Sequence, residues 1–130
     1  MDAGTICLRV GERPCRSWNP EHVAVGRDVN SLAGGPEFWR AARQADLIPI
    51  LGVEILTESE RVTLLAQSTQ GYHHLCRLVS ARQLDTEFDL LEQLAAYRRG
   101  LFVICHQSWL LKPLARIIRP ARLLASPRIL

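Results

Sequence analysis

Three polar residues stand where a ligand or metal site could form: Asp28, Glu54 and His106. Glu54 lies near the end of a nearly continuous apolar segment at residues 48–55, and His106 directly follows the apolar run at residues 101–105. Such runs predict buried strands, and α/β proteins place ligand-contacting groups at strand ends. Glu54 is therefore either a ligand-contacting carboxylate or a rim carboxylate paired with a nearby arginine. Asp28 is either a second rim ligand or part of an ordinary Asx turn.

The cysteines and the other histidines give weaker signals. The four cysteines are Cys7, Cys15, Cys76 and Cys105. They lack the C-x-x-C spacing of a structural zinc site, so buried free thiols are expected. Cys105 adjoins His106, but a nucleophile and its base must meet in space, which adjacency in sequence does not provide. His73 and His74 lie mid-helix, where adjacent side chains point about 100° apart and cannot share a metal.

Common phosphate-binding and nucleophile motifs are missing. The sequence contains no P-loop, no G-x-G-x-x-G fingerprint and no G-x-S-x-G nucleophile elbow. Its tryptophans, Trp18, Trp39 and Trp109, are widely spaced and do not indicate an aromatic ladder for stacking bases. From the residues alone, no catalytic constellation assembles.

Length and composition predict one globular domain without a membrane span. The chain has 130 residues, of which 48% are apolar and 22% charged. Its longest unbroken apolar run has five residues, at 101–105, whereas about 20 are needed to cross a bilayer. The first residues show no secretory pattern, so a cytoplasmic protein is expected.

Charge is distributed unevenly along the chain. Beyond Glu92 there are seven basic residues and no acidic residue, although the net charge of the whole chain is only +3. Such a basic segment could attract the phosphate backbone of DNA. It could equally be a solvated helix face together with residues that once met an acidic neighbouring domain.

The elements that must position these residues alternate between strand and helix periods. The predicted order is β, β, α, β, β, α, α, β, α, β. Strands are expected at 5–10, 22–25, 48–55, 61–67, 101–105 and 123–125, with a turn-like segment at 26–35. Helices are expected to start near Pro36, Ser68 and Asp89 and to cover 108–118, with Gly100 as a left-handed stop. This pattern indicates an α/β fold with mostly parallel strands and flanking helices, open or barrel-like.

Three segments carry a family resemblance: RDVNSLAGGPEFWRAARQADLIPILGVEI, VTLLAQSTQGYHHLCRLVSAR and DLLEQLAAYRRGLFVI. In order and spacing they resemble the PHP (polymerase and histidinol phosphatase) domain of bacterial DNA polymerase III alpha subunits and error-prone DNA polymerases. The stretches PILGVE and TLLAQSTQGY are the most specific. The resemblance covers about residues 22–125 and implies a partial, distorted (β/α)7 barrel within a single truncated domain over residues 1–130.

The resemblance also implies a metal cluster, most of whose ligands this chain lacks. The family's opening His-x-His falls at Arg9 and Gly11, and its Thr-Asp-His falls at residues 27–29, where only the aspartate, Asp28, is kept. Arg61 stands where many members have a histidine. The retained ligand set is thus the vestigial trio already named, two carboxylates and one imidazole. Several anionic or imidazole donors are needed to hold neighbouring divalent cations, so no cofactor is expected.

The expected function is a non-catalytic scaffold derived from the N-terminal region of such a polymerase. The parent family is a DNA-directed DNA polymerase, in DNA replication or error-prone repair synthesis, and this chain alone is expected to be inactive. Two alternatives stay open: a residual metal-dependent phosphoesterase or exonuclease using Zn, Mn or Mg, and a nucleic-acid-binding module working through the basic C-terminal third. Expected partners are other polymerase domains or subunits and, through unpaired strand edges, further copies of the chain.

Overall fold

The computed structural model describes residues 5–7 and 23–126. Along the chain the elements are β1 (Thr5–Cys7), β2 (Val23–Val29), α1 (Gly35–Gln44), β3 (Ile48–Leu56), β4 (Arg61–Ala66), α2 (Thr69–Leu84), α3 (Leu90–Tyr97), β5 (Leu101–Cys105), α4 (Ser108–Ala115), a 3-10 turn (Pro120–Arg122) and β6 (Leu123–Ala125). Apart from the 3-10 turn, this is the predicted order of helices and strands. Arg9 and Gly11, the positions implied for the first family ligands, lie outside the described residues.

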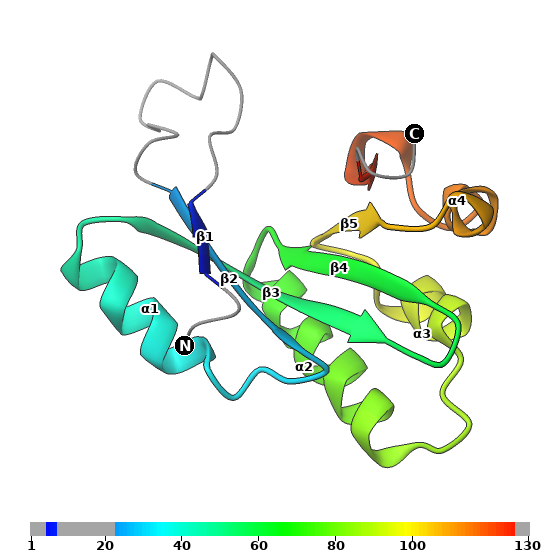
Figure 1. Ribbon diagram of the computed structural model, residues 1–130, viewed down its shortest axis with the longest axis horizontal. Coiled ribbons are helices and arrows are strands. Elements are labelled where there is room, and N and C mark those ends of the chain that lie inside the picture. Colours follow the sequence, from blue (N-terminus) through cyan, green and yellow to red (C-terminus); the bar gives the residue numbers. More distant parts are fainter. Residues whose placement is uncertain (1–4, 8–22, 127–130) are drawn as a thin grey trace.

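The strands form one open, mixed sheet in the order β1-β2-β3-β4-β5-β6 (Figure 1). The expectation of mostly parallel strands is wrong, because only β2–β3 and β5–β6 are parallel. The β3–β4 connection is a tight turn at residues 57–60, too short for a parallel crossover. Between β4 and β5, α2 carries the chain away and α3 returns it, so Gln67 N donates to Gly100 O over 2.8 Å and the two strands pair antiparallel.

The second strand is longer than the sequence predicts. Residues 26–29, expected in a turn, pair with β3 as part of β2. Pairing with the nine-residue strand β3 overrides the tendency of the glycine and polar residues in this segment to form a turn, since strand propensity depends on context. Gly26 has a structural purpose here, because a Cβ at this position would lie 2.5 Å from Cδ1 of Phe38. The absent side chain lets α1 pack closely on the sheet.

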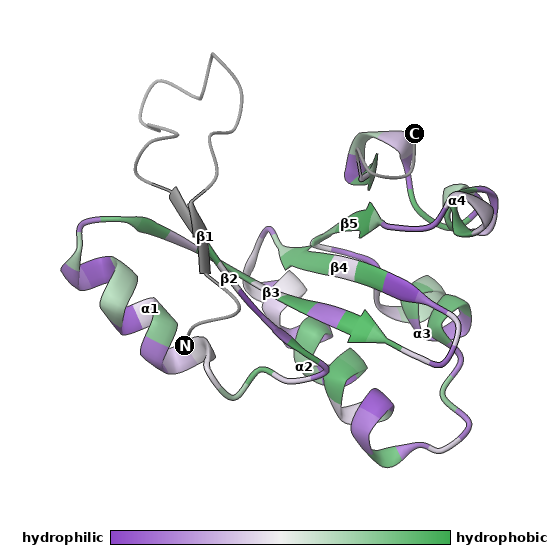
Figure 2. Cartoon of the chain, in the orientation of Figure 1, coloured by the Kyte–Doolittle hydropathy of each residue, from purple (hydrophilic) through white to green (hydrophobic). Residues whose placement is uncertain are grey.

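Helices α1, α2 and α3 lie on the same side of the sheet (Figure 1). Residues from β3, β4, β5, α2, α3 and α4 form the main core, which includes the fully buried Val53, Leu64, Leu75, Leu94 and Leu110. Phe38 and Ala42 of α1 form a smaller cluster with Leu47 and Leu51. Figure 2 shows the largely apolar β3 and β4 interrupted by hydrophilic positions. Within the described part of the chain, no helix has the length and hydropathy needed to cross a membrane.

The predicted helix signals are confirmed by their hydrogen bonds. Ser68 Oγ accepts from Gly71 N over 3.1 Å, and Asp89 Oδ1 accepts from Leu91 N over 3.1 Å. Each side chain satisfies a backbone donor at the start of a helix. Gly100 has a φ of 77°, the left-handed conformation that glycine adopts without a Cβ clash.

Candidate functional site

Five polar side chains gather on the sheet and its edge: Arg27, Glu54, Arg61, Thr63 and His106. We call them the Glu54 cluster. Val53 and Ile55 are buried in the core beside α2, so Glu54, lying between them, points to the other face of the sheet. Glu54 and Thr63 are directly opposite each other in the β3–β4 pairing. Both are buried, with exposed fractions of 8% and 3%.

Hydrogen bonds join the cluster across four neighbouring strands. Both carboxylate oxygens of Glu54 accept from arginines: Oε1 from Nε of Arg61, and Oε2 from Nη1 of Arg27 over 3.3 Å. The same Nη1 donates to Thr63 Oγ1 over 3.1 Å. Thr63 Oγ1 in turn lies 2.8 Å from Nε2 of His106, which directly follows β5. Among the described residues, no buried side-chain nitrogen or oxygen lacks a partner.

The electrostatics of the cluster favour a neutral imidazole. Burial lowers the pKa of His106, the positive charges of Arg61 and Arg27 lower it further, and Glu54 opposes them. Thr63 Oγ1 accepts from Arg27, so its own proton is available for donation to Nε2 of the neutral ring. The cluster is therefore one carboxylate held by two cations, extended by a hydroxyl and an imidazole.

This arrangement is poorly suited to hold a divalent cation. A metal would need lone pairs of Glu54 that already accept from guanidinium groups, and it would sit beside two fixed positive charges. Over residues 5–7 and 23–126, no group of three or more His, Cys, Asp or Glu side chains is arranged to hold a metal ion. The donors present do not fit a cluster of metal ions.

Sequence comparison identifies the family. The family model described as the PHP domain matches residues 17–120, most of the chain. The chain belongs to the PHP domain family.

The relatives found for this PHP domain are much longer polymerases, and the chain spans less than a tenth of the length of each. An error-prone DNA polymerase of Pseudomonas aeruginosa is 43% identical over 61 residues, covering 45% of this chain and 6% of the relative. A second error-prone DNA polymerase, from Symbiobacterium thermophilum, is 39% identical over 61 residues, 46% of this chain and 6% of the relative. The DNA polymerase III subunit alpha of Pasteurella multocida is 34% identical over 94 residues, 63% of this chain and 8% of the relative.

The structure brings together only two of the three predicted ligands of the PHP domain. Glu54 and His106 belong to the same cluster and are linked through Thr63 and Arg27. Asp28 follows Arg27 on β2, so it points to the opposite face, where its Oδ2 accepts from Gly34 N over 3.3 Å. It supports the loop that leads into α1.

Two of the cysteines of the PHP domain, Cys76 and Cys105, are free thiols, as expected. Cys105 is buried and Cys76 is partly buried. Burial raises the pKa of the Cys105 thiol, while a hydrogen bond from the Gln107 backbone acts in the opposite direction. Cys105 belongs to the core, whereas the adjacent His106 reaches Thr63 on the other face. Adjacency therefore does not make them a catalytic pair.

Of the two interpretations of Glu54, a ligand-contacting carboxylate or a carboxylate paired with arginine, the structure supports the second. Arg27 and Arg61 stand at positions where the family resemblance implied a threonine and a histidine. Thr63 had no expected role, although it links Arg27 to His106. The β3–β4 turn at residues 57–60 was the available signal, because its register places Thr63 opposite Glu54.

Proposed function

We propose that this PHP domain is a non-catalytic structural module that acts together with other polymerase domains, on the same chain or a separate one. One observation carries the proposal: Glu54, a ligand position implied by the family resemblance, has both oxygens engaged by arginines. The arginines supply the positive charge that a metal would otherwise bring. The ionic network joins β2, β3, β4 and the end of β5, so the former ligand position now stabilises the sheet.

The relatives support a role beside a polymerase. They are error-prone DNA polymerases and DNA polymerase III alpha subunits, and the matched part is under a tenth of each. We propose that the domain works in cytoplasmic DNA replication or repair synthesis through contacts with such domains. The open sheet also offers a contact surface for another chain, because the edge strand β6 exposes half of Leu124.

An assay for phosphate-ester hydrolysis tests the proposal. The full chain is incubated with Mn²⁺, Zn²⁺ or Mg²⁺ and with p-nitrophenyl phosphate or an end-labelled DNA strand. We expect product at the rate of metal and buffer alone, because the Glu54 cluster offers no open metal position. Metal-dependent release that disappears in Glu54→Gln, but persists in the exposed control Glu58→Gln, would show a residual hydrolase and overturn the proposal.

A further inference from the structure

Two adjoining hollows lie at the end of the sheet where β4 ends and β5 begins, away from the Glu54 cluster. The first has a volume of about 650 Å³ and the second about 620 Å³. Gln67 and Ser68, which follow β4, line both hollows. The two hollows share these two lining residues, and we call them together the Gln67 groove.

One half of the Gln67 groove is strongly basic. Its lining includes four arginines, Arg98, Arg99, Arg119 and Arg122, and no acidic residue. All four are exposed, and none forms an ion pair with an acidic residue in the described part of the chain. Arg122 donates to Gln67 Oε1 over 2.9 Å, which holds its guanidinium beside the groove. Four unneutralised guanidinium groups around one hollow favour a ligand with several phosphates.

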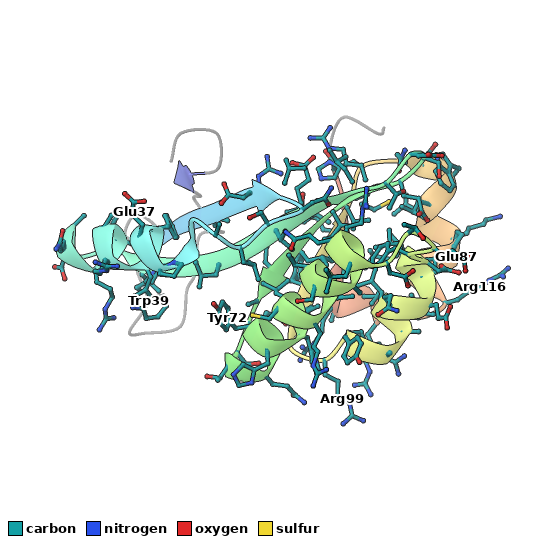
Figure 3. The ribbon with its side chains drawn as sticks, turned by 90° about the horizontal axis from the view of Figure 1, so that it is seen from below. Glu37, Trp39, Tyr72, Glu87, Arg99 and Arg116 are labelled. Carbon is teal, nitrogen blue, oxygen red and sulfur yellow. The ribbon has the colours of Figure 1, made fainter. Side chains whose placement is uncertain are left out.

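The other half of the groove is apolar and aromatic. Trp39 of α1 and Tyr72 of α2 line it together with Pro36, Pro49 and Leu51. Figure 3 shows Tyr72 on the side of α2 that faces α1, from which Trp39 projects. Trp39 is 46% exposed although it is a large aromatic residue. The guanidinium of Arg43 lies 5.9 Å from the centre of its ring.

The backbone around the basic half is rigidly built. Gly71 packs against Gly100 so closely that a Cβ on Gly71 would lie 2.0 Å from Gly100 O. His74 Nδ1 lies 2.7 Å from Arg99 O, which ties the turn before β5 to α2. The arginine pair at 98–99 is thus presented on a fixed turn next to Ser68.

We propose that the Gln67 groove binds single-stranded nucleic acid. The arginines contact successive phosphates, and Trp39 with Tyr72 provides a surface on which a base stacks. Flat aromatic side chains beside a basic groove are the combination that single-strand binding uses, because every base has a stacking face. A duplex keeps its bases stacked inside, and an acidic peptide would use only the basic half. The proposal is independent of the non-catalytic role, since it involves a different end of the sheet.

Fluorescence anisotropy with a labelled oligothymidylate of about 12 nucleotides tests the proposal. The full chain should bind, with log K falling against log salt at a slope of about −3, or −0.7 for each of four phosphates. The double variant R119E/R122E should bind at least tenfold more weakly. K112E/R116E makes the same change in net charge at Lys112 of α4 and at Arg116, which directly follows α4. Both residues lie outside the groove lining, so this variant should change the affinity less than twofold. Figure 3 shows Arg116 far from Tyr72.

Stacking is tested separately from charge. Trp39→Ala should weaken oligothymidylate binding about tenfold without changing the salt slope, whereas Trp109→Ala, at a similarly exposed residue of α4, should have no effect. Absence of binding at 50 mM salt, or equal losses in the two charge-reversal variants, would overturn the proposal. Competition by polyglutamate as strong as by unlabelled oligothymidylate, with Trp39→Ala unaffected, would instead assign the groove to an acidic peptide.

Discussion

Replacing Glu54 by glutamine should lower the free energy of unfolding by about 2–3 kcal/mol. The side chain of Glu54 is 10% exposed, and its carboxylate accepts from both Arg27 and Arg61. Its neutralisation leaves two guanidinium groups facing each other with no counter-charge. Loss of one partner from a fully buried ion pair costs about 3–5 kcal/mol, but the side chain of Arg61 is 47% exposed, and solvent screening reduces the cost.

Urea unfolding followed by tryptophan fluorescence measures this effect. Glu58→Gln is the matched control, because it makes the same chemical change at an exposed residue in the nearby turn and should stay within about 0.5 kcal/mol. An empty metal site predicts the opposite sign, since neutralising one of several clustered ligand carboxylates relieves repulsion. A Glu54→Gln protein as stable as the parent, or more stable, would therefore contradict the account.

Gly71→Ala should cost about 3 kcal/mol or more, or prevent folding. The new Cβ would lie 2.0 Å from the oxygen and 2.8 Å from the carbonyl carbon of Gly100. These are backbone atoms, and Gly100 O also accepts from Gln67 N, so neither side of the contact can move aside cheaply. Because this contact joins α2 to the start of β5, its loss should disrupt the sheet and the Gln67 groove together.

Gly35→Ala is the control for Gly71→Ala. Both glycines lie in the first turns of helices, but a Cβ on Gly35 would meet only Leu51 Cδ2, at 3.9 Å. Gly35 precedes Pro36, whose ring disfavours a helical conformation for a preceding residue that carries a Cβ, so Gly35→Ala should change the free energy of unfolding by no more than about 1 kcal/mol. The midpoints of thermal and urea unfolding should therefore fall much further in Gly71→Ala than they change in Gly35→Ala. Equal stabilities would show that the Gly71–Gly100 contact is not tightly packed.

The sequence predicts the order of helices and strands because local signals mark each boundary. Ser68 and Asp89 cap the helices that follow them, and Gly100 occupies a left-handed position. Strand direction and strand length depend on pairing between distant segments. The antiparallel strand pairs and the extension of β2 to Val29 were therefore not predicted from the sequence.

The sequence predicts where two residues of the candidate site lie, but not which side chains they contact. Glu54 and His106 are found at neighbouring strand ends. The side chains of β2 alternate between the two faces of the sheet, so Arg27 points toward Glu54 and Asp28 points to the opposite face. Trp39 and Tyr72, 33 positions apart in the sequence, line one hollow only because α1 and α2 pack on the same sheet face. Residues so distant in sequence are brought together by the tertiary fold, which the hydrophobic periodicity of the sequence does not specify.

Calorimetric titration of the full chain with Mn²⁺ tests most directly whether arginines have replaced metal at Glu54. Mn²⁺ is the suitable probe because it prefers oxygen donors and does not favour the thiols elsewhere in the chain. The account predicts heats of dilution only, in the parent protein and in Glu54→Gln alike. Saturable, stoichiometric binding that is lost in Glu54→Gln and retained in Glu58→Gln would contradict it.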